Sequence, residues 1–186
     1  MKMRKVLILV ETKTEKLLKI SLEVLAAAKK ISDCCELNVI GFDRNLPQFA
    51  KLLAKHGANK LYLLKNKKLN IYMVNNYTQA FLQVCDAVQP DIILVPNTVI
   101  GVDLALQIEM NKEVELVTNV TDINFSEGDL YFTRSTTLSL LNELKKVECG
   151  IPLVVVHKDS FSPKEVGGTV EIVDFAVNIK DLQLTI

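Results

Sequence analysis

Four short, mainly apolar runs constrain the fold of this chain more than any other feature. They occupy residues 5–10 (KVLILV), 37–42 (LNVIGF), 60–64 (KLYLL) and 92–95 (IILV). Runs of this length with apolar residues at consecutive positions are typical of strands buried on both faces. Segments with helical spacing separate them. This alternation predicts an α/β fold whose parallel strands are joined by helical crossovers.

The helical segments carry recognisable start and stop signals. Thr14 offers an N-cap to the first helix, and the helix after the second strand has Pro47 in its first turn and Gly57 just past its end. The expected helices span residues 14–33, 46–56, 72–88 and 103–110. Helices of this length are sufficient to cover both faces of the sheet, so we expect a three-layer sandwich.

The pattern changes after a fifth strand at residues 116–120. Two short runs, 122–125 and 130–133, flank the turn sequence SEGD and indicate a hairpin. Apolar runs at 151–156 and 171–177 follow. We therefore expect a mainly parallel sheet with antiparallel strands added at one edge, from Asp122 onward. We treat residues 1–186 as a single domain, with 171–186 as an extension or linker.

The C-terminal stretch FAVNIKDLQLTI alternates apolar and polar residues and includes Leu182, Leu184 and Ile186. Such side chains suggest packing against something. We expect a partner surface, a second copy of the chain in a homo-oligomer, or the edge of the chain's own sheet to cover this stretch.

Charge and cysteine usage exclude several classes of protein. The chain of 186 residues has 22 basic and 22 acidic residues, which gives no electrostatic footprint for nucleic acid. No apolar run reaches the roughly 20 residues of a membrane-spanning helix. The four cysteines form no Cys-x-x-Cys pair that would indicate zinc or dithiol chemistry. We expect a cytoplasmic protein without a nucleic-acid or membrane partner.

The stretch DIILVPNTVIGVDLALQI (residues 91–108) is the best candidate for a ligand site. Ligands of open α/β sheets bind beyond the carboxyl ends of the strands. Asn97 and Thr98 follow a strand, Gly101 permits close backbone approach or a positive φ, and Asp103 is expected to open the next helix. An acid there favours the helix dipole and disfavours a bound phosphate. The alternative is an N-cap and a packing turn without a ligand.

Motifs for catalysis and nucleotide binding are absent from the sequence. No G-x-G-x-x-G or P-loop pattern occurs, and His56 and His157 have no neighbouring nucleophile in the sequence. No group of residues has metal-ligand spacing. We therefore predict neither a metal site nor a catalytic centre, and expect the chain not to be an enzyme.

Several motifs in order resemble the amino-terminal domain of the electron transfer flavoprotein alpha subunit. The stretch from residue 90 onward carries most of them: Pro90-Asp91, the turn Pro96–Thr98, Gly101-x-Asp103-Leu104, VTNVTDI at 117–123, and Thr133-Arg134. Earlier segments are also similar, namely VLILVET, AAA at 26–28, and GANKL at 57–61. The resemblance covers nearly the whole chain.

The resemblance implies a fold, a cofactor and partners. The fold would be the adenine nucleotide alpha hydrolase-like sandwich. The family complex contains a beta subunit and one FAD, which is held mainly by a carboxy-terminal domain of the alpha subunit. The sequence contains no counterpart of that domain, so we expect no FAD on the isolated chain. A beta-like subunit or a separate FAD domain would then be the partner.

Two positions depart from the family pattern. Gln107 stands where the family usually has an arginine, and Ser135 follows Arg134 where the family usually has a proline. The leading interpretation is a scaffold and subunit-contact domain of a flavin electron carrier. The alternative is a small-ligand or adenine-nucleotide-binding protein that uses a cleft near Asn97, Thr98 and Arg134. An enzyme with dispersed catalytic residues is a third, weaker reading.

Overall fold

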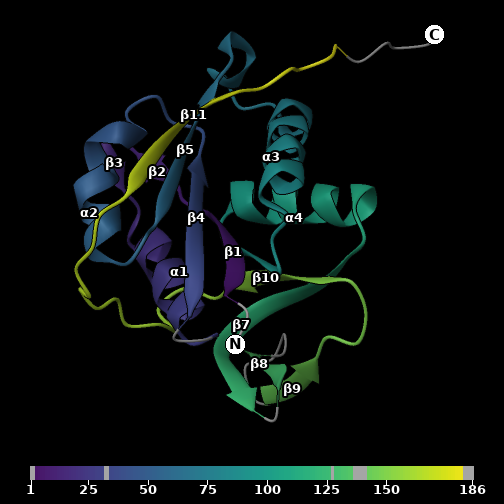
Figure 1. Ribbon diagram of the computed structural model, residues 1–186. Coiled ribbons are helices and arrows are strands. Elements are labelled where there is room, and N and C mark those ends of the chain that lie inside the picture. Colours follow the sequence, from purple (N-terminus) through teal and green to yellow (C-terminus); the bar gives the residue numbers. More distant parts are fainter. Residues whose placement is uncertain (1–2, 32–33, 127, 136–141, 182–186) are drawn as a thin grey trace, which may run out of the picture.

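The computed structural model describes residues 3–31, 34–126, 128–135 and 142–181, which contain a nine-stranded sheet (Figure 1). In spatial order its strands are β11 (Glu171–Ala176), β5 (Lys60–Lys65), β4 (Cys35–Gly41), β1 (Arg4–Leu9), β6 (Ile92–Pro96), β10 (Ile151–Val156), β7 (Val114–Ser126), β8 (Asp129–Ser135) and β9 (Asn142–Lys146). The predicted α/β class is confirmed.

The strands from β11 to β7 pair in parallel, and β8 and β9 are antiparallel. β7 changes partner along its length: it pairs in parallel with β10 up to Val120 and antiparallel with β8 from there to Ser126. The predicted hairpin and the antiparallel edge are therefore confirmed. The predicted fifth strand and first arm of the hairpin are one continuous strand.

Two strands after Asp122 do not follow our expectation of antiparallel pairing. β10 lies in parallel between β6 and β7, and β11 pairs in parallel with β5 at the opposite edge. Residues 153–156 of β10 are all buried, as expected for an interior strand covered on both faces. Leu182, Leu184 and Ile186 lie outside the described residues.

Helices cover both faces of the sheet and give the predicted three layers (Figure 1). The helices α1 (Lys19–Lys29) and α2 (Ala50–Lys55) pack against one face, and α2 continues the 3-10 turn η1 (Leu46–Phe49). The helices α3 (Val74–Val88) and α4 (Val99–Asn111) pack against the other face. Alternate residues of β1 face the two layers, with Val6 in the first core cluster and Leu7 in the second.

The first helix begins later than the sequence predicted. Residues 12–17 form a small hairpin of β2 (Thr12–Lys13) and β3 (Lys16–Leu17), and α1 starts at Lys19. Thr14 and Glu15, between the two strands, have φ of 47° and 61°. Two consecutive positive φ values suit a tight hairpin turn and are incompatible with the start of a helix. The predicted N-cap at Thr14 was therefore wrong.

In the described part of the chain, no helix combines the length and the apolar character that crossing a bilayer requires.

Candidate functional site: a cleft at the carboxyl edge of the sheet

The strand order reverses between β1 and β6, which are neighbours at the centre of the sheet. After β1 the chain moves outward through β4 and β5, and it then returns to β6 on the other side of β1. Ligands of open α/β sheets bind outside the carboxyl ends of the strands at such a point. Glu11 follows β1 and Thr98 follows β6, so both lie at this edge.

Thr98 joins the two strand ends and begins α4. Its hydroxyl donates to Oε1 of Glu11 at 2.5 Å and accepts the backbone N–H of Gly101 at 2.9 Å. The second bond makes Thr98 the N-cap, so α4 starts at Val99. Our expectation that Asp103 opens this helix was therefore wrong. Threonine is on average a weaker N-cap than aspartate, but here the bond to Glu11 fixes its hydroxyl.

Asp103 instead lies in the second turn of α4 and accepts a hydrogen bond from the phenol of Tyr72 at 2.9 Å. Burial, followed by the bond to Asp103, raises the pKa of Tyr72 to about 12. The phenol therefore stays protonated and donates at any ordinary pH. This bond ties the segment before α3 to the middle of α4.

Gly101 meets the backbone of the preceding turn at close range. A Cβ at this position would lie 2.0 Å from the carbonyl oxygen of Pro96 and 3.1 Å from Oγ1 of Thr98. The predicted close backbone approach is confirmed. The predicted alternative of a positive φ is not, because Gly101 is a helical residue. The glycine lets α4 start immediately after β6.

Asn97 and Arg134 lie in different parts of the same edge. Asn97 donates from Nδ2 to Oδ1 of Asn119 at 3.0 Å, next to Thr98. Arg134 in β8 contacts Oε2 of Glu143 through Nε and Nη2, at 2.8 and 2.7 Å. Three strand spacings separate β6 from β8, or roughly 14 Å. The structure thus gathers Asn97, Thr98 and Gly101, with Asp103 one turn away, and leaves Arg134 apart.

A cavity of about 440 Å³ opens beside the end of β1, and its lining includes Glu11, Thr12, Phe42, Asp43 and Tyr77. The rings of Phe42 and Tyr77 stack with centroids 3.8 Å apart, and the hydroxyl of Thr12 donates to Asp43. Burial raises the pKa of Glu11 above its ordinary value, and the hydrogen bond from Thr98 partly offsets this effect.

The cavity continues over the ends of β4 and β5. A second hollow of about 430 Å³ shares Phe42, Asp43 and Arg44 with the first and reaches Lys65 and Lys67. The first cavity therefore holds the acids Glu11 and Asp43 beside Arg44, and the second adds the basic side chains of Lys65 and Lys67. A phosphate next to both Glu11 and Asp43 would be repelled, whereas the second cavity offers it more positive charge.

Sequence reasoning missed most of the cleft lining. None of the five residues proposed from the sequence lines either cavity, although Thr98 is bonded to Glu11, which does. The signal for Glu11 and Asp43 was available, because both come directly after predicted parallel strands. The rings of Phe42 and Tyr77 meet across 35 positions of sequence, and no local pattern indicates that contact.

The chain is similar to known proteins over most of its length. A family model described as Electron transfer flavoprotein domain matches residues 6–180. The electron transfer flavoprotein subunit alpha of Bacillus subtilis (strain 168) is 27% identical over 131 residues, which are 70% of this chain and 40% of that protein.

Two further relatives match the chain with similar identity and coverage. The electron transfer flavoprotein subunit alpha of Thermoanaerobacterium thermosaccharolyticum is 29% identical over 125 residues, covering 66% of this chain and 38% of that protein. Protein FixB of Clostridium saccharobutylicum is 30% identical over 128 residues, covering 67% and 38%. The chain thus spans about 40% of the length of these curated relatives.

Proposed function

The chain belongs to the electron transfer flavoprotein family, and we propose that it is the scaffold and subunit-contact domain of a flavin electron carrier. Its curated relatives are named electron transfer flavoprotein subunit alpha and FixB, which supports a role in electron transfer. In this role the chain contributes binding surfaces, and the flavin supplies the redox chemistry.

The observation that carries this proposal is the apolar outer surface of α4 and of the segment before α3. We call it the α4 patch; it consists of Ile71, Tyr72, Met73, Val99, Leu106 and Met110. Val99, Met110 and Ile71 are 79%, 77% and 76% exposed. Exposed apolar clusters of this kind mark interaction sites on soluble proteins.

α4 is apolar on its inner face as well. Leu104, Ala105 and Ile108 are buried against the sheet, while Val99, Leu106 and Met110 point outward. A helix that is hydrophobic all round is normally covered on both sides. α4 itself carries the acids Asp103 and Glu109 and no lysine or arginine. Asp103 has the helical spacing of Val99, Leu106 and Met110, so the patch suits a partner surface that is apolar and carries a basic group opposite Asp103.

We propose that this partner is a beta-like subunit or a separate FAD domain. The first cavity of this chain is lined by the acids Glu11 and Asp43, which disfavour the pyrophosphate of FAD at that place. The described residues also offer no glycine-rich turn at a helix start where a pyrophosphate is usually held. We therefore expect the isolated chain to bind no FAD.

Co-purification with the beta-like subunit tests the proposal. The two chains are produced together, and a tag on the beta-like subunit recovers the complex. We expect Val99→Asp with Met110→Asp to abolish recovery of this chain. Val166→Asp is the matched control, because Val166 is also exposed (58%) but lies outside the α4 patch. Equal recovery of both variants would contradict the proposed surface, whereas failure of the unaltered chain to co-purify would contradict the proposed function.

A second candidate function is the binding of an adenine nucleotide or another small ligand. The two connected cavities at the switch point favour it, because Arg44, Lys65 and Lys67 line the second cavity and suit a phosphate there. Calorimetric titration of the purified chain with AMP and with ATP, together with analysis of small molecules released on denaturation, separates the two functions. Saturable binding of AMP, together with failure of the chain to co-purify with the beta-like subunit, would favour this second candidate.

A further inference from the structure

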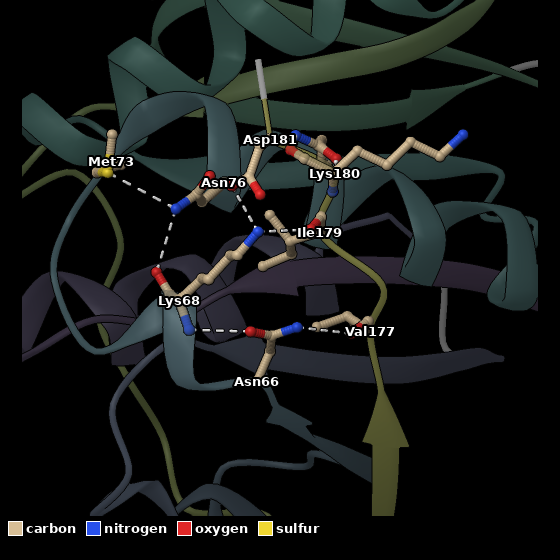
Figure 2. A network of polar contacts seen from close by, with 9 residues as sticks. Asn66, Lys68, Met73, Asn76, Val177, Ile179, Lys180 and Asp181 are labelled. Atoms are coloured by element: carbon tan, nitrogen blue, oxygen red, sulfur yellow. Dashed lines mark hydrogen bonds and ion pairs between the residues drawn. The ribbon is translucent and has the colours of Figure 1, made fainter. Parts of the chain in front are cut away.

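The chain between Ala176 and Asp181 belongs to no helix or strand, yet it is held at every residue. β11 ends at Ala176, and the chain then runs past the segment before α3 and along α3 itself (Figure 2). Asn66, Lys68, Gln79 and Gln83 supply the polar contacts that hold residues 177–181. We call these four residues the backbone clamp.

Two glutamines of the clamp bind the main chain as a neighbouring strand would. Gln83 donates from Nε2 to the carbonyl of Asn178 at 2.8 Å and accepts its N–H at 2.9 Å. Gln79 makes the same pair of bonds with Lys180, at 3.0 and 2.9 Å. Each side-chain amide thus imitates a peptide group at a strand edge.

The spacing of the glutamines matches that of an extended chain. Residues four apart on a helix are separated by roughly 6 Å along its axis. Residues two apart on a strand are separated by roughly 6.6 Å. Gln79 and Gln83 therefore meet Lys180 and Asn178 in register, and the segment runs antiparallel to α3.

The remaining contacts define which peptide fits. Asn66 donates to the carbonyl of Val177 at 2.9 Å, and Lys68 donates to the carbonyl of Ile179 at 3.0 Å (Figure 2). The side chains of Val177 and Ile179 are buried in the second core cluster, and Asp181 pairs with Lys68 at 2.6 Å. The clamp therefore accepts a strand with aliphatic residues two apart and an acid two positions further on.

We propose that the backbone clamp is a peptide-binding site whose ligand is the segment 177–181, bound here in cis and replaceable by the same segment of a second copy. The segment continues β11, whose last residue Ala176 pairs with Lys65, but the contacts of the clamp are made only to residues 177–181. All except the Asp181 pair involve main-chain groups or apolar side chains, which a separate strand presents equally well. Recognition of this kind is strand addition with glutamine side chains in place of a sheet edge.

Hydrogen exchange on the unaltered full-length chain tests the proposal first. We expect the amides of Asn178 and Lys180 to be protected, and to exchange about tenfold faster in Gln79→Leu with Gln83→Leu. Gln48→Leu is the control, because Gln48 is exposed on η1, away from the segment. Equal protection of these amides with and without the two glutamines would overturn the proposal that the clamp holds the segment.

Addition of a peptide then tests replacement in trans. The probe is FAVNIKD, the sequence of residues 175–181. A short tether gives an effective concentration on the order of millimolar, so the peptide is added at comparable concentration. We expect it to accelerate exchange at Asn178 and Lys180 of the chain. The same peptide N-methylated at the positions of Asn178 and Lys180 should have no effect.

A variant with a disabled segment gives a second measurement of replacement. Val177→Asp with Ile179→Asp leaves the clamp intact and prevents burial of the tethered segment. Labelled FAVNIKD should bind this full-length variant saturably, and about tenfold more weakly after Gln79→Leu with Gln83→Leu. If the variant does not fold, the exchange experiment on the unaltered chain decides alone. Failure of the peptide to accelerate exchange there would overturn replacement by a second copy.

Discussion

Replacement of Gly101 by alanine should destabilise the protein, although the same change inside most helices is stabilising. Alanine in a helix interior usually gains about 0.5–1 kcal/mol over glycine. At Gly101 the added Cβ would lie 2.0 Å from the carbonyl oxygen of Pro96. Both atoms are fixed to the backbone, so no side-chain rotation relieves the contact. The first turn of α4 must therefore move away from the end of β6.

The magnitude follows from the contacts that this movement disturbs. Overpacking in a well-packed region costs about 1–3 kcal/mol. Loss of the N-cap bond from Gly101 to Thr98, now 2.9 Å long, costs about 0.5–2 kcal/mol. Subtraction of the intrinsic gain leaves a range of about 0.5–4.5 kcal/mol, so we expect Gly101→Ala to lower the free energy of unfolding by about 2.5 kcal/mol. The sign of the change in stability is therefore informative, because the same substitution in most helices raises the stability.

Urea unfolding followed by circular dichroism measures this change. Gly128→Ala is one control, because a Cβ there meets no atom within 4 Å and only its positive φ of 92° is strained. That strain costs about 1–2 kcal/mol. Thr98→Ala is the second control. If both substitutions act through the same cap, Gly101→Ala should cost less in the Thr98→Ala background. An unchanged or increased stability of Gly101→Ala would show that the first turn of α4 accepts a Cβ without leaving the end of β6.

Three further outcomes are expected. Burial raises the pKa of Glu11, so the folded state binds this proton more tightly than the unfolded state. Its contribution to stability is present below the ordinary pKa of 4.5 and is lost as pH rises through the higher folded value. Urea unfolding across this pH range should therefore show a smaller fall in the free energy of unfolding for Glu11→Gln than for the unaltered chain. Equal falls in the two proteins would count against this effect. Burial raises the pKa of Cys85 to about 12, so a thiol reagent at pH near 8 should modify the exposed Cys34 and Cys149 and reach Cys85 only after unfolding. Tyr72→Phe should cost about 1 kcal/mol through loss of the bond to Asp103, and spectrophotometric titration should show one fewer phenol ionising near pH 12.

The sequence predicted the parts of the fold that are encoded in short runs. Strands buried on both faces must be apolar at every position, which is why β1 and β6 were found. The hairpin of β7 and β8 was found because its turn residues are local signals. The place of β10 between β6 and β7 was not predicted, because an apolar run does not specify which strands it joins.

Tertiary contacts decided the details that the sequence left open. Thr98 and Asp103 are both suitable helix caps, and the bond between Thr98 and Glu11 accompanies the earlier start. Each glutamine of the backbone clamp contacts a residue about a hundred positions away. A glutamine in a helical sequence gives no indication of such a partner, so the clamp could be found only in the structure.

We propose that the chain joins a flavin carrier without holding the flavin itself, and the FAD content of the purified proteins is the decisive measurement. The chain is purified alone and in complex with the proposed partner, a beta-like subunit or a separate FAD domain, and FAD released on denaturation is measured against protein. We expect no FAD on the isolated chain and stoichiometric FAD in a complex that contains it. Stoichiometric FAD on the isolated chain, or a flavin complex that assembles without this chain, would show that the chain does not have this role.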